Sequence, residues 1–515
     1  MGATGSVAPL RGCLHCPQVV RSIVTRPEDW MVFGRASAES VSDARFRVRC
    51  VSGSRCGLER GIESEMPQPH ESSMALRWDP RIMIRPPYVP CPACGESAFG
   101  TLSISNNHWI RRCRSCNHTG TTRLPSLQKR LIYVDQMVLS NIAKALDPVW
   151  RETRGEQDSF WVELFKGLER LVKMQLAVCV ESPIHDQESA VTPYAATLRR
   201  LREYLSEKVE FHSPIVVLQH QLHNALRSVE ANVPVTLDTY LGAGARDVTD
   251  GRLDQWADRL QISVNFARSG DDIESYRRSR DQAGNAMEHI WARWATQSGR
   301  RFQDWYDEER RSLYPTWTGL HRQHVLRMER YTYGTQRPED MEDIINPGMA
   351  VMVVFGLLHH FKEAGCSVTQ AHERLQTFFS SEAALQAPAN DISSLLFAAL
   401  ARKAAAGQKK VPNRGTPNDI NAISSYLPYC QALFVDDQFA GLLREKPLVT
   451  QLQRYGASVY SNNSRDAFLT FLKQVESDAP PDHVARVIEV YGEDWLTSFD
   501  SILADERARR APRNT

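Results

Sequence analysis

The sequence predicts a mixed α/β fold built around a parallel sheet and preceded by a small cysteine-bearing module. Three short apolar runs, at 131–134, 176–180 and 432–435, have the length and composition of buried parallel strands. Stretches with helical spacing of apolar residues separate these runs. Two C-x-x-C pairs precede the first run. We therefore expect a parallel sheet flanked by helices, with a metal-binding module before it.

Composition places the chain among globular proteins and excludes several function classes. It has 515 residues, 42% of them hydrophobic and 24% charged, which is enough for two to four domains with a sizeable core. The net charge of +1 means that any basic surface for nucleic acid must be local. The longest apolar run, 349–358, is too short to span a bilayer, and the first residues show no secretory signal. We expect a cytoplasmic protein with no membrane partner.

The region 1–86 differs in composition from the rest of the chain. It contains arginine, serine and glycine but no lysine, since the first lysine is Lys129, and it shows no sustained period. We expect this region to be mostly disordered. A start codon placed too early, with Met74 as the true start, would also explain its composition. A second metal site is an open alternative, although no strand or turn pattern flanks its cysteines: Cys13, Cys16, Cys50 and Cys56.

The segment 87–124 is predicted to be a zinc ribbon. Its cysteines form a C-x2-C-x18-C-x2-C pattern at Cys91, Cys94, Cys113 and Cys116. Two such knuckles bring four thiolates together, and Zn²⁺ favours tetrahedral sulfur ligation. All four ligand positions would be filled, so the metal is expected to be structural. Two nearby histidines, His108 and His118, are then spare.

The role of this ribbon stays open between three alternatives. Zinc could serve only to hold together a fold whose core is too small. The stretch "HWIRRCRSC" could instead contact phosphates and a stacked base through Trp109, Arg111, Arg112 and Arg114. A ribbon can also dock a protein partner.

Helical patterns fill most of the remaining chain. Residues 155–178 read as a helix running into a strand, and 194–228 as helical. A charged region at 245–345 carries tryptophans at helical intervals, which we interpret as packing anchors rather than stacking platforms: Trp256, Trp291, Trp294, Trp305 and Trp317. An apolar helix follows at 347–362, and 390–443 reads as helix, loop, helix, strand, helix. The charged end of the chain is expected to fray.

Acidic residues stand at the ends of the apolar runs. Asp135 ends the first, Glu181 and Glu188 follow the second, and Asp436 and Asp437 end the third. In open parallel sheets, ligands bind at the carboxyl ends of the strands, so these acids can converge on one crevice. Clustered carboxylates raise one another's pKa unless a cation lies among them, and Mg²⁺ or Mn²⁺ prefers oxygen ligands. Such a site can activate water and stabilise the charge of a phosphoryl group.

Four acidic motifs in this order resemble the PIN-domain nucleases. Asp135 in "YVDQMVLSNIA" matches the acid that closes the first strand, and Glu188 in "SPIHDQE" lies six residues after Ser182. Asp419 in "TPNDINAISSYLPYC" opens a helix before the last long strand, and Asp436 in "VDDQFAGLL" fits a D-x-x-F pattern. The resemblance covers about 128–230 and 385–445.

The resemblance implies a PIN-like three-layer fold around a parallel sheet and a metal-dependent nuclease activity, with RNA as the expected substrate. Asp135, Glu188, Asp419 and Asp436 would hold Mg²⁺ or Mn²⁺, with Asp437 as an adjacent ligand. The expected units are 1–86, the ribbon 87–124, the two halves of the domain at 128–240 and 385–470, a helical insertion at 241–384 and a C-terminal helical tail at 471–515. The chain departs from the family in this insertion and in Val435, which stands where a Ser or Thr is usual.

Other interpretations of the same residues are open. Asp135 and Asp419 could be helix caps, and Asp436 and Asp437 turn residues. Asp391 is a further acid at a helix start, and His185 could contact phosphate or be structural. The chain could be an inactive adaptor that binds nucleic acid or protein, or an antiviral nuclease whose insertion senses a trigger. No glycine-rich phosphate loop or G-x-S-x-G elbow is present in the sequence, which argues against a nucleoside triphosphatase or a serine hydrolase.

Overall fold

A computed structural model describes residues 80–147, 150, 159–192, 194–250, 252–258, 270–334, 341, 344–345 and 347–493. The expectations for 1–79, including the second cysteine site and Met74, lie outside the described residues, as does the end of the chain after 493. Mixed α/β architecture, mostly helical and with a parallel sheet, is confirmed.

The central sheet has four parallel strands in the order β6-β5-β7-β8. The predicted runs form β5 (Arg130–Val134), β6 (Ala177–Cys179) and β7 (Ala432–Phe434). The edge strand β8 (Ser458–Tyr460) was not predicted, because three half-exposed residues give too short a pattern. In register, Ile132 lies opposite Cys179 and Ala432, and Val134 lies opposite Phe434.

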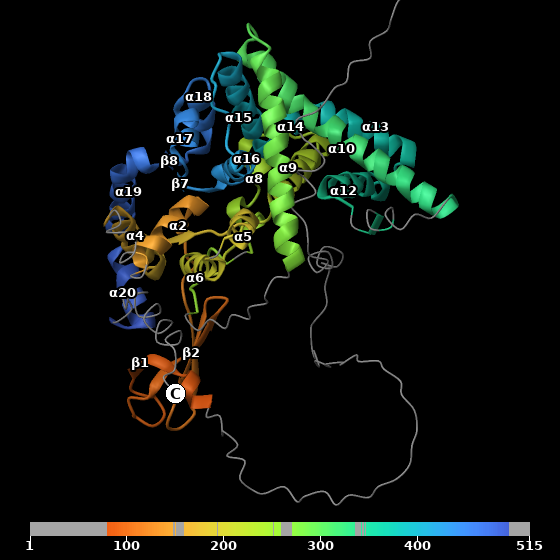
Figure 1. The fold of residues 1–515 in the computed structure, drawn as a ribbon. Helices are drawn as coiled ribbons and strands as arrows, with labels where there is room; N and C mark the ends of the chain where they lie inside the picture. The colour runs from red at the N-terminus through yellow and green to blue at the C-terminus, as the bar shows by residue number, and fades with distance from the viewer. Residues whose placement is uncertain are drawn as a thin grey trace, which may run out of the picture.

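Helices cover both faces of this sheet, because side chains alternate along each strand. On one face Ile132, Val134 and Phe434 pack against α2 (Gln136–Leu146), α4 (Ser159–Lys173), α6 (Ala195–Ser206) and α19 (Arg465–Ser477). On the other face Leu131 and Leu433 pack against α15 (Pro388–Ala405), α16 (Thr416–Tyr426) and α17 (Asp437–Arg444). Figure 1 shows α4 and α19 together at one side of the molecule.

The stretch expected as a helical insertion shares the core of the sheet. It contains α9 (Gly270–Ala295), α10 (Phe302–Tyr333), α12 (Met349–Glu363) and α13 (Val368–Ser380). Trp291, Trp294 and Trp305 enter the cluster beneath β5 and β7. Trp256 and Trp317 are also buried, each 2% exposed. The tryptophans therefore pack as anchors, and α9 and α10 are part of the main body. Figure 1 shows α12 and α13 on the side away from α19.

The cysteine-bearing module is a four-stranded antiparallel sheet that begins earlier than expected. A short 3-10 helix at Pro80–Met83 precedes β1 (Arg85–Val89), β2 (Phe99–Ser105), β3 (His108–Cys113) and β4 (Thr119–Arg123). Residues 80–86, which were expected to be disordered, thus belong to this module.

The module is docked on the main body rather than independent. A cluster of buried apolar side chains joins Trp109 and Leu124 to Trp256 and to Val487 of α20 (Pro481–Tyr491). The Trp256 indole donates a hydrogen bond of 2.8 Å to the Pro125 carbonyl. The predicted C-terminal helical tail, 471–515, therefore contributes the second half of α19 to the core of the sheet and α20 to the ribbon contact.

The remaining helices connect these units. They are α5 (Pro183–Ala190), α7 (Pro214–Glu230), α8 (Leu237–Leu241), α14 (Glu382–Leu385) and α18 (Leu448–Leu452). Among the helices of the described residues, none combines the length and apolar character that a membrane crossing requires.

Candidate functional site

The order of the parallel strands places two of the predicted acids side by side. The chain passes from β5 to β6 on one flank and then to β7 on the other, so the switch point lies between β5 and β7. Asp135 follows β5 directly, and its backbone amide donates to the Phe434 carbonyl at the end of β7, at 2.9 Å. Asp436 comes two residues after Phe434. In open α/β sheets, ligands bind in the crevice at such a switch point.

Both of these aspartates also cap a helix. One carboxylate oxygen of Asp135 accepts the Met137 amide, and one of Asp436 accepts the Phe439 amide, each at 2.7 Å. The capping interpretation is therefore correct for Asp135, whereas Asp436, for which a turn was the alternative, caps α17. Capping does not exclude a second role, since a carboxylate has about four acceptor positions and these two bonds hold the side chains in a fixed orientation.

The two other predicted acids come from helices on the same side of the sheet. Ser182 caps α5 and Pro183 begins it, which places Glu188 in its second turn. Asp419 lies in the first turn of α16. Between them, the Asn418 side chain donates a hydrogen bond of 3.1 Å to Glu188 Oε1. Asn418 therefore joins α16 to α5 and orients Glu188.

The pKa shifts show that the four carboxyl groups share one electrostatic environment. Burial, together with the charge of Asp436, raises the pKa of Asp135 to about 6. Burial and the charge of Asp135 raise the pKa of Glu188 to about 7. The pKa of Asp419 is well above its ordinary value because of burial and because Asp135, Glu188 and Asp436 all act on it. The pKa of Asp436 is raised in the same direction by burial and by Asp437.

No cation within the described residues neutralises this group through an ion pair. Arg280 of α9 lowers the pKa of Glu188, and Lys410 lowers the pKa of Asp436, but neither forms a salt bridge with these acids. Neither residue was predicted from the sequence. Lys410 lies in the "QKKVPNRG" loop before Asp419, which is a weak signal, whereas nothing near Arg280 in the sequence indicates its position beside Glu188.

The carboxylates are nevertheless more widely spaced than the ligands of a closed ion cage. Across the described ranges, only one group of three or more His, Cys, Asp or Glu side chains has all its ligand atoms within 4.8 Å, and it is the cysteine cluster. Repulsion between carboxylates favours such spacing when no cation lies between them.

Several other predicted residues lie outside the carboxylate group. Asp437 is exposed, and its carboxylate accepts the Asn463 amide of the 3-10 turn Asn462–Ser464 at 3.0 Å, so among the four acids it acts on Asp436 alone. Asp391 is buried against Arg454, 2.6 Å away, and the Tyr306 hydroxyl. Glu181 accepts the Ser206 hydroxyl at 2.9 Å.

His185 is a structural residue and not a phosphate contact. Its side chain is buried, its ring stacks on Tyr133 with centroids 4.9 Å apart, and Nε2 is 2.9 Å from the Val134 carbonyl. Burial and the nearby Arg202 guanidinium lower its pKa to about 3, so the ring is neutral. His185 therefore supports the end of β5, from which Asp135 projects.

The cysteine cluster has the geometry of a tetrahedral metal site. All four sulfurs lie within 4.8 Å of one another, with Cys91 and Cys116 3.6 Å apart and Cys94 and Cys113 3.7 Å apart. Tetrahedral Zn–S bonds of about 2.3 Å would separate sulfurs by about 3.8 Å. The four cysteines can therefore hold a metal ion, as predicted. His108 and His118 are exposed and are not members of the cluster.

The thiols of this cluster interact strongly. The backbone amide of Cys116 lowers the pKa of Cys113 to about 6. The pKa of Cys94 rises to about 12, because contacts with Cys116, Cys113 and Cys91 outweigh the hydrogen bond from the Glu96 backbone. Thiols this close retain some of their protons unless a cation replaces them.

The structure contradicts base stacking by Trp109. Trp109 is 1% exposed, and its indole donates to the Thr101 hydroxyl at 2.8 Å, so it cannot stack on a base. Arg111 packs over the Trp109 ring, 4.3 Å from its centroid. The sequence of β3 did not indicate this burial, because Arg111 lies between Trp109 and Cys113 on the same face of the strand and interrupts the apolar pattern.

Comparison with protein-family models, with curated proteins and with solved structures found no match for this chain.

Proposed function

We propose that this chain is a metal-dependent PIN-like nuclease that hydrolyses phosphodiester bonds, with RNA as the expected substrate. The observation that carries the proposal is the convergence of buried carboxyl groups, in which Asp135, Glu188 and Asp436 all lie close enough to Asp419 to raise its pKa in addition to the effect of burial. These acids come from four separate segments, and two of them lie at the switch point of a parallel sheet covered by helices on both faces. This arrangement is the one that the PIN-like resemblance implies.

The donor set fits a hard divalent cation. Carboxylate and amide oxygens are the ligands that Mg²⁺ and Mn²⁺ prefer, and Asn418 adds an amide beside Glu188. Such an ion, when bound, activates water and offsets charge on a phosphoryl group. Asp135, Glu188, Asp419 and Asp436 are the residues that would hold one or two ions. The ion would also remove the repulsion that raises their pKa values.

Hydrogen bonds within the site hold three of the four acids in place. The caps on α2 and α17 fix Asp135 and Asp436, and Asn418 fixes Glu188. Arg280 and Lys410 supply positive charge near opposite members of the group, Glu188 and Asp436. We infer that these two cations meet the phosphates on either side of the scissile bond, where they reduce repulsion between the acids and the nucleic-acid backbone.

We also propose that the cysteine cluster holds a structural zinc ion. Four sulfurs at tetrahedral separations fit Zn²⁺ and leave no ligand position open. Because the module packs on Trp256 and α20, the ion would stabilise a surface of the main body as well as the module itself.

The test is cleavage of single-stranded RNA and DNA oligonucleotides of mixed sequence with Mn²⁺, by the parent, Asp135→Asn and Asp437→Asn proteins. Asparagine is also a good helix cap, so Asp135→Asn preserves the start of α2 while it removes a charge. We expect Asp135→Asn to lose activity and Asp437→Asn to retain it. Equal cleavage by the parent and Asp135→Asn would refute the assignment.

A second candidate is an adaptor that binds nucleic acid or protein without cutting. The spacing of the carboxylates favours this candidate, because no three of the acids have ligand oxygens that all lie within 4.8 Å of one another among the described residues. Titration calorimetry with Mn²⁺ separates the two, with Asp419→Asn as the comparison. A nuclease requires Mn²⁺ binding that weakens in the variant, whereas an adaptor requires none.

A further inference from the structure

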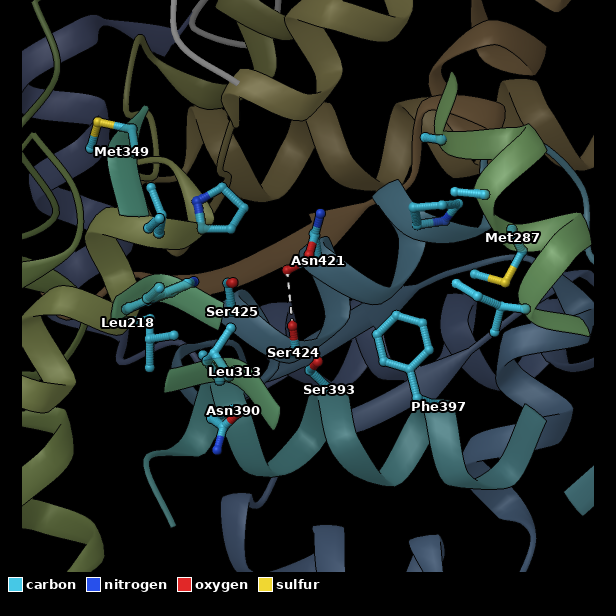
Figure 2. Close-up of a pocket in the computed structure, with 18 residues that line it drawn as sticks. Leu218, Met287, Leu313, Met349, Asn390, Ser393, Phe397, Asn421, Ser424 and Ser425 are labelled. Carbon is cyan, nitrogen blue, oxygen red and sulfur yellow. Dashed lines mark hydrogen bonds between the residues drawn. The ribbon is translucent and has the colours of Figure 1, made fainter. Parts of the chain in front are cut away.

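A partly enclosed cavity lies among the helices on one side of the sheet. It is bounded by side chains of α7, α9, α10, α12, α15 and α16 and has a volume of about 120 Å³. Its walls are apolar: in Figure 2, Leu218 and Met349 lie on one side and Met287 and Phe397 on the other. An engineered apolar cavity of about 150 Å³ holds one benzene molecule, so this space is suited to a single ring.

One edge of the cavity is polar and incompletely hydrogen-bonded. Ser393 of α15 and Asn421, Ser424 and Ser425 of α16 lie together between the apolar walls (Figure 2). The Ser424 hydroxyl donates to the Asn421 carbonyl at 3.2 Å. Within the described part of the chain, the side chains of Ser393, Asn421 and Ser425 form no hydrogen bond with protein. They can therefore serve a ligand.

The lining also indicates the charge of a ligand. None of the described residues that line the cavity is charged, which disfavours an ionised ligand.

We propose that this cavity binds an uncharged aromatic ring with an amide-like edge. The ring would lie against Met287 and Phe397, its carbonyl would accept from the serine hydroxyls, and its N–H groups would donate to the Asn421 side chain. This site is distinct from the carboxylate group but shares two helices with it. Pro417 and Asn421 of α16 line the cavity, whereas Asp419 between them belongs to the carboxylate group.

The second shared helix is α9. Ala283, Ala286 and Ile290 line the cavity at helical spacing, and Arg280 lies one turn before Ala283, where its charge acts on Glu188. A molecule bound in the cavity would therefore contact two of the helices that bring charge to the proposed active site, α9 and α16.

The experiment uses benzamide as the probe, detected by saturation-transfer NMR with the full chain. Benzoate has the same ring with a charged edge, and toluene has the same ring without a polar edge. We expect benzamide to bind and both comparison molecules to bind at least about tenfold more weakly, which corresponds to about 1.4 kcal/mol.

Two variants and a matched control assign the site. Ala286→Leu adds side-chain volume to the cavity wall on α9 and should abolish benzamide binding. Ala292 lies on the exposed face of the same helix, so Ala292→Leu is the control and should leave benzamide binding unchanged. Ser425→Ala removes a polar group without filling the space and should weaken benzamide more than toluene. Absence of benzamide binding, equal binding of benzoate, or unchanged binding in a folded Ala286→Leu protein would each overturn the proposal.

Discussion

Replacement of Glu188 by glutamine tests the claim that uncompensated carboxylates share one site. Its pKa rises from the ordinary 4.5 to about 7, chiefly through burial and then through Asp135. The folded protein therefore holds this proton more tightly than the unfolded chain, and the free energy of unfolding must fall as pH rises from about 4.5 to about 7. Above about pH 7 the Glu188 side chain is charged, and the free energy of unfolding of the metal-free protein is lowered by the full cost of that buried charge.

The magnitude follows from the shift. A change of 2.5 pKa units corresponds to about 3 kcal/mol at 1.36 kcal/mol per unit. Glu188 is only half-buried, so solvent screens part of this effect, and we expect about 1–2 kcal/mol. In Glu188→Gln the penalty is absent, while the amide can still pair with Asn418. The variant should therefore equal the parent near pH 4.5 and exceed its stability by this amount at pH 8.

The assay is urea denaturation of chelator-treated protein at several pH values between 4.5 and 8. Glu163→Gln, on the exposed part of α4, is the control and should follow the pH dependence of the parent. The same difference between Glu188→Gln and the parent at pH 4.5 and pH 8 would refute the reasoning, because the effect would then be one of packing and not of charge.

Three further predictions concern the metal sites and the docking of the ribbon. Cys113→Ser should lose tightly bound zinc in elemental analysis, whereas Cys366→Ser, far from the cluster, should retain it; retention in both would contradict the proposed ligand set. Trp256→Ala should destabilise the protein by about 3–5 kcal/mol and speed proteolysis between the ribbon and the sheet, and an unchanged protease pattern would contradict the docking. Mn²⁺ affinity measured by calorimetry should rise from pH 5 to pH 8, because Asp135 with a pKa of about 6 and Glu188 with a pKa of about 7 must lose protons to bind the ion; a flat profile would count against these ligands.

Short-range patterns predicted the elements that carry the site. The run 131–134 forms β5, and its four buried side chains pack into the two apolar clusters on opposite faces of the sheet. The strand ends before Asp135, which caps α2. The two knuckles of the ribbon followed from cysteine spacing alone. These features could be predicted because the residues that determine them lie within a few positions of one another.

Other features required contacts between distant parts of the chain. The burial of Trp109 depends on Trp256 and α20, so no local pattern around "HWIRRCRSC" could exclude a base-stacking role. The membership of Trp291 in the core of the sheet likewise depends on how α9 packs against α15 and α16. From the sequence, the predicted helical insertion at 241–384 therefore could not be distinguished from a segment that packs into the core of the sheet.

The sequence by itself determined β5, β6 and β7, the cysteine knuckles and the helices that follow Asp135, Ser182 and Asp436, because capping and alternation act over a few residues. Only the tertiary structure decided that β7 adds beside β5, since a parallel neighbour joined by a long crossover leaves no local trace of its pairing. That pairing places Asp436 next to Asp135. The approach of Arg280 and Lys410 to the carboxylates was likewise decided by packing across the chain.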